Sequence, residues 1–421
     1  MPTTVSASSA APPPSGWRTP AVVIACGCVI GLLAFGPRST VGFFVQPMTT
    51  EFPWGRDVFA FAFAIQNLLW GIGQPVAGAI ADRYGTARVL VTGVLFYAAG
   101  LMLMEVSSTP LMLMLSIGLT IGIGLSACSF NLVVTGFGKL IPEHMRSMAA
   151  GAATAAGSFG QFLYAPLGVA LIDGVGWKST LTVFAALTLI ALPMTLAMRT
   201  PPAMATAGLD GAGRDLPAQS FRAAMAEAFS HRSYVLLVLG FFTCGFQLAF
   251  VTAHLPSYLI DRGLPAEVGG WVIAVIGLFN IAGALGVGWL ANRYPSRYIL
   301  ALIYFTRAVS IALFISMPIS VGSALAYGVV TGLTWLSTVP PTSGLVALMF
   351  GTRWLSTLFG IAFFSHQVGG FLGVWLGGIF FARTGSYDTV WWLSVLFGVL
   401  SALINLPIIE KPVARQAAAT A

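Results

Sequence analysis

Long apolar runs separated by short polar segments dominate the pattern of hydrophobic and polar positions along this chain. Each run has about 20 or more residues, the length that an α-helix needs to cross a hydrocarbon layer about 30 Å thick. The pattern therefore predicts twelve membrane-spanning helices. The expected spans are 20–46, 58–81, 87–106, 110–137, 147–172, 177–198, 233–260, 267–290, 298–317, 321–345, 355–382 and 388–409.

The polar segments divide the chain into two halves with six predicted spans each. The halves are residues 20–198 and 233–410, and the segment 199–232 connects them. Within this connection, Phe221-Arg-Ala-Ala-Met-Ala-Glu-Ala-Phe229 predicts a short amphipathic helix that lies on the membrane surface. The two ends, 1–19 and 411–421, are expected to form tails, of which the first is disordered because it consists mostly of Ala, Ser, Thr and Pro.

Composition agrees with a membrane protein. Charged residues are 8% and hydrophobic residues 57% of the chain, and the mean hydropathy is +0.88. A soluble domain has about 25% charged residues, so this chain lacks the charge to cover a surface in water. The net charge of +7 comes from single Lys and Arg residues scattered along short loops, unlike the basic stripe of a nucleic-acid-binding protein. We expect an all-α membrane protein in contact with lipid, with no nucleic-acid partner.

The basic residues also predict the orientation of the spans. Most of the 20 Lys and Arg residues fall in loops on the side of the N-terminus. Arg56, Lys178, Arg262 and Arg383 fall in loops on the other side. Basic loops remain in the cytoplasm during membrane insertion. We therefore expect a multi-pass protein of the plasma (inner) membrane with both termini in the cytoplasm.

A charged hairpin occurs once in each half of the chain. The copies are Gly78-Ala-Ile-Ala-Asp82-Arg83-Tyr84-Gly85-Thr-Ala-Arg88 and, half a chain later, Gly288-Trp-Leu-Ala-Asn292-Arg293-Tyr294-Pro295-Ser-Arg297. Such a repeat in a hydrophobic chain predicts two similar helix bundles. The first copy resembles the signature loop between the second and third helices of the major facilitator superfamily, and the second lies where that family repeats the loop. The resemblance implies twelve helices in two pseudo-symmetric six-helix bundles and transport by alternating access.

The resemblance also implies that this loop latches one side of the transporter closed. Asp82 lies where the second span meets the cytoplasm, and a carboxylate there can bind the free amides of a helix N-terminus. In the superfamily that N-terminus is the start of the eleventh helix. We expect Gly78 to permit close helix contact and Gly85 to permit a tight turn. Arg83, Arg88, Asn292 and Arg293 complete the predicted latch, although a purely topological role is the alternative for Arg83 and Arg88.

The ionisable groups inside the predicted spans are basic. All 13 Asp and Glu residues fall in loops or at span ends, so we expect no carboxylate at the membrane midplane. Arg38, Arg307, His254 and His366 do fall inside spans. Intramembrane ionisable residues are costly and usually functional. A cavity with cations and without acids is expected to bind an anion.

Arg38 is the main candidate anchor for that anion. It follows Gly36 and Pro37, which can loosen the first span and expose backbone to a cavity, and a guanidinium can grip a carboxylate with two parallel hydrogen bonds. The alternative is an arginine that is paired structurally or snorkels to the membrane interface. The Pro37-Arg38-Ser39 environment, ahead of two phenylalanines, resembles the first helix of the monocarboxylate transporters, where a basic residue contacts the substrate carboxylate.

His366 is the second candidate contact. The segment Gly360-Ile-Ala-Phe-Phe-Ser-His366 resembles the eleventh helix of the oxalate–formate antiporters, where the position of His366 holds a substrate-binding lysine. The chain departs from both families in the eighth span, where their basic residue is missing and Ala284 stands nearby. This departure favours a substrate with one carboxylate. His254 and His366 are also candidate proton carriers, since free imidazole titrates at a pH of about 6.5, and a neutral, hydrogen-bonded histidine is the alternative for each.

Uncharged polar residues in the spans complete the predicted lining, although any of them could instead form hydrogen bonds between helices. Arg307 has the same alternative, because the ninth helix is usually peripheral in the superfamily. The predicted substrate contacts are Arg38, His366, Gln66, Asn67, Tyr164, Gln247, Asn280 and Arg307; Asn131 and Gln161 are further polar lining residues, and Trp70, Phe246, Trp335, Phe363 and Phe364 are candidates for an apolar wall.

These features predict a secondary transporter for a small organic anion, in the first place a monocarboxylate, that functions as a monomer by proton symport or anion exchange. One alternative is an efflux transporter for amphipathic, drug-like compounds, although such pumps usually keep an intramembrane acid for cations. Another is a membrane sensor that does not transport, although sensors of that kind tend to carry a large soluble loop or tail. The sequence has no nucleotide-binding loop, nucleophile motif or metal cluster, so we expect no enzyme activity, metal site or cofactor.

Overall fold

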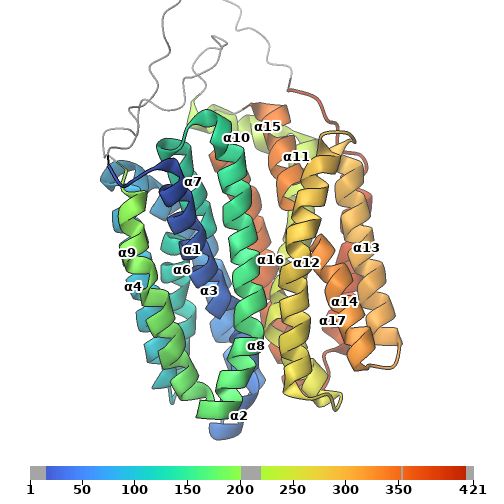
Figure 1. Cartoon of the computed structure of the whole chain (residues 1–421). Helices are drawn as coiled ribbons and strands as arrows, with labels where there is room; N and C mark the ends of the chain where they lie inside the picture. The colour runs from blue at the N-terminus through green and yellow to red at the C-terminus, as the bar shows by residue number, and fades with distance from the viewer. Residues whose placement is uncertain (1–15, 201–219, 352–353, 414–421) are drawn as a thin grey trace, which may run out of the picture.

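The computed structural model describes residues 16–200, 220–351 and 354–413, and these ranges form an all-helical bundle (Figure 1). Most of the predicted N-terminal tail (1–15), most of the predicted C-terminal tail (414–421) and residues 201–219 of the connection lie outside the described residues. The predicted amphipathic helix is α10 (Phe221–Ser230), which lies at one end of the bundle. We call this the α10 end, and the opposite one, where α2 lies, the α2 end.

The described part of the N-terminal half crosses the bundle six times. The first and fourth crossings each consist of several short helices, and the fifth and sixth are joined in one long helical segment. Its helices are α1 (Pro20–Ser39), η1 (Val41–Phe44), α2 (Val45–Glu51), α3 (Arg56–Tyr84), α4 (Thr86–Glu105), α5 (Pro110–Leu113), the π-helical η2 (Met114–Ile121), α6 (Gly122–Cys128), α7 (Phe130–Leu140), α8 (Glu143–Leu189), α9 (Ala191–Thr195) and η3 (Leu196–Met198).

The C-terminal half repeats this number of crossings. After α10 come α11 (Arg232–Asp261), α12 (Ala266–Ala291), α13 (Ser296–Ser316), α14 (Val321–Thr334), α15 (Val339–Phe350), α16 (Leu355–Thr384) and α17 (Asp388–Asn405). The tenth crossing is interrupted between α14 and α15, where the sequence pattern predicts a continuous span over 321–345.

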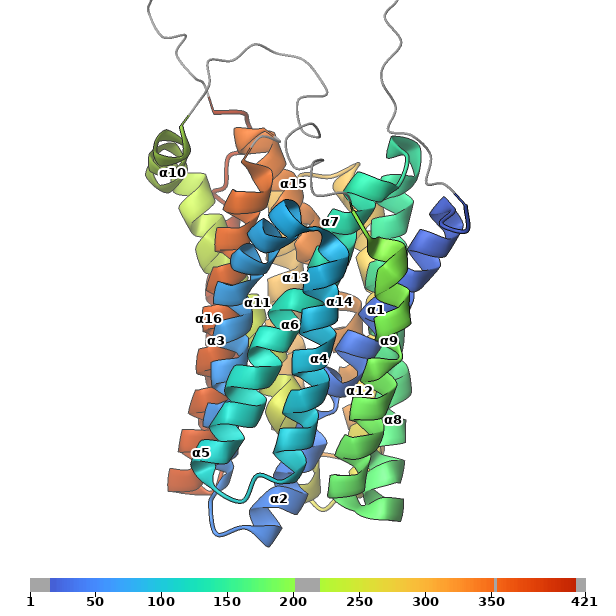
Figure 2. The same cartoon turned by 90° about the vertical axis from the view of Figure 1, so that its left-hand side faces the viewer.

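Length and apolar composition identify 10 membrane-span candidates among the described residues. One of them, His144–Met198, has 55 residues and turns back at Gly176, whose φ of 84° requires glycine, so it accounts for two crossings. The 29-residue α3 crosses beside them (Figure 2). The result is the twelve-helix, two-bundle membrane fold that the sequence predicts.

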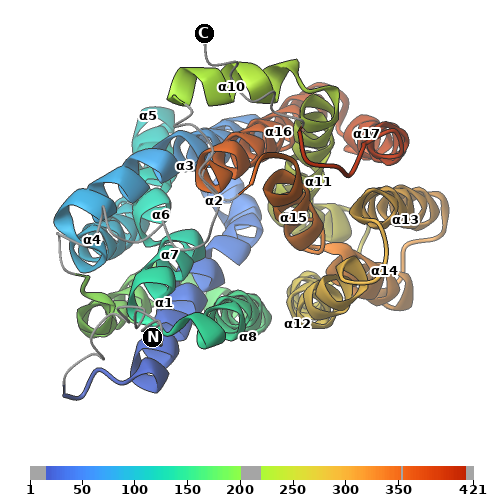
Figure 3. The same cartoon turned by 90° about the horizontal axis from the view of Figure 1, so that it is seen from above.

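The two halves form separate bundles that meet along two seams. In the view along the helices, α3 lies next to α16 and α8 lies next to α12 (Figure 3). Small residues permit this proximity: a Cβ added at Gly277 of α12 would meet the Ser158 carbonyl oxygen of α8 at 2.7 Å. Close backbone approach through small residues is a general way of packing helices in lipid.

An ion pair joins the bundles at the α2 end. Arg56 at the start of α3 binds both carboxylate oxygens of Asp261 at the end of α11, at 2.5 and 2.8 Å. The same guanidinium donates to the Tyr387 hydroxyl at 3.1 Å and lies 4.1 Å from the Phe381 ring centroid. The Arg56 side chain is only 11% exposed. This end of the bundle is therefore held closed by a bidentate pair with little solvent screening.

We expect Asp261→Asn to favour the conformation that is open at the α2 end. Loss of one bidentate, half-buried charge pair should shift the conformational equilibrium about tenfold, or about 1.4 kcal/mol. Distances between spin labels at the exposed positions Val106 and Met317, which belong to different bundles, measure the shift. The control is Asp388→Asn, because Asp388 binds Arg262 at 3.2 Å within one bundle and both side chains are about half exposed. Equal distance distributions in both variants would contradict the gate.

Among the described residues, Asp82 is paired within its own bundle, where it binds Lys139 of α7. No contact of Asp82 with the described start of α16 is present in this part of the chain. Gly78 has no atom within 4 Å of an added Cβ, so it makes no close helix contact here. Gly85 does form the predicted tight turn, with a φ of 95°. The Asp82 latch remains a prediction for a conformation in which the α10 end is closed.

The arginines near the latch have local partners. Arg83 lies 5.3 Å from the ring of Tyr84, and Arg293 lies 3.6 Å from the ring of Trp289. Arg88 is exposed on α4, and Asn292 ends α12. These positions agree with simple topological charges as well as with the latch.

Candidate functional site

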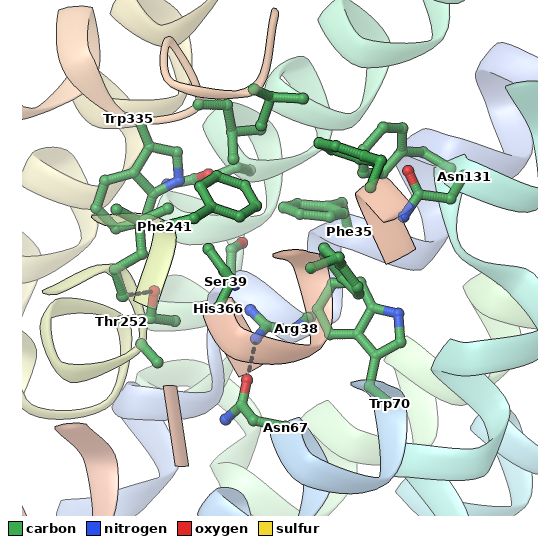
Figure 4. A pocket seen from close by; sticks show the side chains of 18 residues that line it. Phe35, Arg38, Ser39, Asn67, Trp70, Asn131, Phe241, Thr252, Trp335 and His366 are labelled. Carbon is green, nitrogen blue, oxygen red and sulfur yellow. Dashed lines mark hydrogen bonds between the residues drawn. The ribbon is translucent and has the colours of Figure 1, made fainter. Parts of the chain in front are cut away.

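A cavity lies between the two bundles (Figure 4). It contains about 740 Å³ of space between its lining atoms, part of it open to the outside. Its 18 lining residues come from both halves of the chain: Phe35, Arg38, Ser39, Asn67, Trp70, Phe130, Asn131, Gln161, Phe241, Leu248, Ala249, Thr252, Trp335, Leu336, Val339, Phe359, Phe363 and His366.

Arg38 enters the cavity from the last turn of α1 because the helix ends there. Pro37 lies inside the helix, and α1 stops at Ser39, followed by the 3₁₀ turn η1. Two hydroxyl groups satisfy carbonyls freed at this end: Ser39 Oγ donates to Gly36 O at 2.6 Å, and Thr40 Oγ1 donates to Pro37 O at 2.7 Å. The helix opening expected at Pro37 is thus present, and it places Arg38 at the cavity.

The Arg38 guanidinium is held by neutral groups. Its Nη2 donates to Asn67 Oδ1 at 2.7 Å, while the Asn67 amide nitrogen donates to Phe63 O at 3.0 Å. The guanidinium carbon lies 4.7 Å from the Trp70 ring centroid, which is a cation–π distance. Arg38 Nε is buried and has no hydrogen-bond partner among the described residues. These contacts orient the charge without neutralising it.

The electrostatics of the cavity are set by this one side chain. Among the described lining residues Arg38 is the only Lys or Arg, and none is Asp or Glu. A charge in a site of low dielectric interacts more strongly with a ligand than it would in water. Within the described residues, the cavity thus carries one uncompensated positive charge and is suited to one anionic group.

His366 faces the cavity from the C-terminal bundle. Its ring stacks on Phe363 with centroids 5.7 Å apart and an interplanar angle of 8°. Its Nδ1 is 3.1 Å from Gln367 Oε1, within hydrogen-bond distance. Figure 4 shows His366 and Arg38 in the central part of the site. The fold brings together the two residues that the sequence analysis ranks first.

Five of the predicted substrate contacts do not line the cavity. Gln66 faces the interior of its own bundle and donates to Ile117 O at 3.1 Å. Tyr164 packs on Phe184, with ring centroids 5.1 Å apart, and fills the space that Gly36 leaves open. Both are buried between helices of one bundle. In this structure both pack between helices, and a substrate contact of either stays a prediction; the other three residues off the cavity are Gln247, Asn280 and Arg307.

Arg307 and its neighbours support the interruption of the tenth crossing. Arg307 Nη2 donates to the carbonyl oxygens of Thr334 and Trp335, the latter at 2.6 Å. Asn280 Oδ1 accepts from the Leu336 amide at 2.9 Å, and Gln247 Oε1 lies 3.5 Å from Arg307 Nη1. Carbonyls and amides freed where a helix breaks need such partners in a membrane. Hydrogen bonding between helices, the alternative role of Arg307, therefore accounts for its position. The interruption between α14 and α15 presents Trp335, Leu336 and Val339 to the cavity.

His254 also lies away from the cavity. It is 1% exposed, and its Nε2 is 2.9 Å from Val374 O on α16. Gly377 leaves room for the ring, because an added Cβ there would overlap it. His254 thus joins α11 to α16 near the α2 end. A proton-carrying role for it stays a prediction, and His366 is the histidine on the cavity wall.

Aromatic side chains form much of the wall. Of the five aromatics predicted for it, Trp70, Trp335 and Phe363 line the cavity, whereas Phe246 and Phe364 do not. Four further aromatic residues line the cavity that were not predicted, and helical spacing could have indicated two of them. Residues three or four positions apart share a helix face, which relates Phe35 to Arg38 in α1 and Phe359 to Phe363 in α16. The two without such a marker are Phe130 and Phe241.

Comparison with known proteins identifies the family of this chain. The model of the Major Facilitator Superfamily matches residues 27–374. An uncharacterised MFS-type transporter of Bacillus subtilis, YcxA, is 28% identical over 395 residues, which cover 92% of this chain and 94% of that protein. Monocarboxylate transporter 11 of Homo sapiens is 25% identical and covers 93% of this chain, with 83% of its own length matched. Monocarboxylate transporter 3 of Rattus norvegicus is 28% identical, over 81% of this chain and 72% of its own length.

Solved structures agree on the fold. A D-xylose–proton symporter superposes with a TM-score of 0.72 at 16% identity, covering 93% of this chain and 98% of its own. A bacterial homologue of the human lysosomal transporter Spinster, in an inward-facing and unoccupied conformation, gives the same TM-score and 16% identity, covering 93% of this chain and 97% of its own. At these identities the likeness concerns architecture alone. The family match, the twelve-helix fold and the cavity between two bundles together show that this chain is a membrane transporter of the major facilitator superfamily and not an enzyme.

Proposed function

We propose that this transporter moves a small organic anion with a single carboxylate across the membrane by alternating access. The observation that carries the proposal is the state of Arg38: its charge faces the cavity, its hydrogen-bond partner is the neutral amide of Asn67, and no acid is among the described lining residues. A carboxylate can complete the guanidinium's hydrogen bonding and neutralise it. His366 supplies a second polar contact from the other bundle.

The comparisons support a monocarboxylate as the substrate class. Several relatives that match most of this chain are named monocarboxylate transporters. Independently of those names, Arg38 is the only Lys or Arg on the described part of the wall, so the wall offers one permanently charged site for a carboxylate. Proton symport would use His366 or a protonated substrate, and anion exchange would need neither.

We further propose that the α10 end faces the cytoplasm of a cell whose plasma membrane holds the protein. The basic residues Arg18, Arg83, Arg88, Lys139 and Arg222 belong to segments at that end, as the positive-inside rule requires. With this orientation, the Arg56–Asp261 pair closes the outer side. In intact cells, an impermeant thiol reagent should label a cysteine at Ser108, near the α2 end, and not one at Ser230 in α10; the reverse pattern would overturn the orientation.

The second candidate function is efflux of amphipathic compounds, and the aromatic wall is the observation that favours it. The charge of the transported compound distinguishes the two candidate functions. A site with one uncompensated arginine should reject lipophilic cations, which make up many drug-like compounds, because like charge in a cavity of low dielectric is costly.

Transport by purified protein in liposomes tests the proposal. Labelled monocarboxylates are supplied outside, with an inward proton gradient in one set and internal unlabelled anion in another; protein-free liposomes are the control. Saturable uptake that needs the proton gradient would show symport, and uptake that needs internal anion would show exchange. Either result supports the proposal. If a labelled lipophilic cation moves and no carboxylate does, the proposal is wrong and efflux takes its place.

A further inference from the structure

We infer that the preferred substrate carries a flat aromatic ring beside its carboxylate, as benzoate and phenylacetate do. This inference rests on the proposed function and narrows its substrate class. It comes from the composition of the cavity wall, where seven of the 18 lining residues are Phe or Trp. They are Phe35, Trp70, Phe130, Phe241, Trp335, Phe359 and Phe363.

Most polar side chains of the wall already form hydrogen bonds within the protein. Ser39 Oγ donates to Gly36 O, and Thr252 Oγ1 donates to Leu248 O at 2.8 Å. The Gln161 amide donates to Ile273 O across the bundle interface at 3.2 Å. A substrate with several hydroxyl groups would lose its hydrogen bonds to water without equivalent partners, which is costly. The wall therefore favours an anion whose remaining body is apolar.

The arrangement of the rings favours an aromatic body over an aliphatic one. Phe35 meets Trp70 and Phe130 edge to face, with centroids 6.4 and 6.3 Å apart, and Trp70 meets Phe363 at 5.6 Å. Aromatic pairs in such geometries contribute about 0.5–1.5 kcal/mol beyond the area that they bury. A substrate ring beside these side chains would extend the same network, whereas a saturated ring of similar size would gain only burial.

The anchor and the rings are close enough to bind one small molecule together. The Arg38 guanidinium lies against the Trp70 ring at 4.7 Å, and Phe35 is one helical turn before Arg38 on α1. Phe35 and Phe241, one from each bundle, line the same cavity as Arg38 and Ser39 (Figure 4). A carboxylate on Arg38 would place an attached ring among aromatic side chains of both bundles.

Matched pairs of acids test the inference by equilibrium binding to the purified transporter. Benzoate and cyclohexanecarboxylate share charge, carbon number and attachment of the carboxylate, but the ring is flat and aromatic in the first and puckered and saturated in the second; phenylacetate and cyclohexylacetate form a second pair. One or two additional aromatic contacts predict about tenfold tighter binding of each aromatic member. Lactate, which is small and hydroxylated, should bind more weakly than all four.

Adjacent phenylalanines of α16 provide a variant and its control. Phe363 lines the cavity, whereas Phe364 is 38% exposed and lies off its wall. Phe363→Leu should reduce the preference for benzoate over cyclohexanecarboxylate severalfold, and Phe364→Leu should leave it unchanged. A thermal-unfolding curve for each variant confirms that both are folded.

The outcomes distinguish the inference from the function on which it rests. An aromatic preference that falls in Phe363→Leu and persists in Phe364→Leu supports the inference. Equal affinity for both members of each pair, or tighter binding of lactate, would overturn the aromatic class and leave a monocarboxylate transporter. Binding of a lipophilic cation in place of every carboxylate would overturn both proposals.

Discussion

Arg38→Gln is expected to abolish saturable carboxylate transport while the protein remains folded. Removing one partner of a desolvated, hydrogen-bonded charge pair costs about 2–5 kcal/mol, which corresponds to a loss of affinity of about 30-fold or more. Arg38→Lys should be intermediate, because an ammonium keeps the charge but lacks the planar fork. Initial rates in proteoliposomes at several substrate concentrations measure the effect. Wild-type rates in folded Arg38→Gln protein would contradict the assignment.

Asn67→Asp provides a second form of the same prediction with Arg38 left in place. Asn67 Oδ1 lies 2.7 Å from Arg38 Nη2, so a carboxylate there would neutralise the arginine inside the protein and compete with the substrate. Transport of anions should fall as far as in Arg38→Gln, although the variant is nearly isosteric. Gln66→Met, one residue earlier on α3, is the control, because Gln66 bonds to Ile117 and lies off the cavity. Loss of transport in both α3 variants alike would point to a folding effect.

Gly369→Ala is expected to destabilise the transporter strongly. Gly369 lies on α16 against α11, where an added Cβ would overlap the carbonyl oxygen of Phe242. Backbone atoms cannot move aside as a flexible side chain can, so we expect a cost of about 1–3 kcal/mol and a lower yield of monodisperse protein. Gly360→Ala on the same helix has nothing within 4 Å of the added atom. Melting temperatures in detergent should fall for the first variant alone.

An equal effect of the two glycine variants would contradict the packing argument. In that case helix propensity or lipid contact, and not the approach of α11 to α16, would determine stability. The same close approach occurs from the facing helix, where a Cβ added at Gly245 would overlap the His366 carbonyl oxygen. The two glycines together place His366 at the cavity, so the stability of this seam and the geometry of the site are connected.

The fold was predictable because a membrane imposes a simple length rule. Apolar runs of about 20 residues follow from the thickness of the bilayer, and the repeated loop at Asp82 and Asn292 implies two bundles. Breaks within crossings were harder to predict. At the interruption between α14 and α15, Arg307 and Asn280 form hydrogen bonds to freed backbone groups, which are contacts between residues distant in the sequence. A local sign is the pair Pro340 and Pro341 at the start of α15.

The ionisable residues of the site could be predicted from the sequence, but the helix face that each uncharged polar residue occupies could not. Arg38 and His366 are ionisable residues in apolar spans, and intramembrane ionisable groups usually serve function. Gln66 and Asn67 look equivalent in sequence, yet neighbouring residues of a helix point about 100° apart, and only Asn67 faces the cavity. The faces of helices toward the cavity depend on how the two bundles meet, so the aromatic residues Phe130 and Phe241 could not be assigned from spacing alone.

The most direct test of the account is equilibrium binding of one labelled monocarboxylate, such as benzoate, to purified wild-type and Asn67→Asp protein of equal thermal stability. The account predicts saturable binding to the wild type and at least a 30-fold loss of affinity in the variant, because the new carboxylate neutralises Arg38. Equal affinity of the two proteins would contradict the central claim that the uncompensated charge of Arg38 binds the substrate.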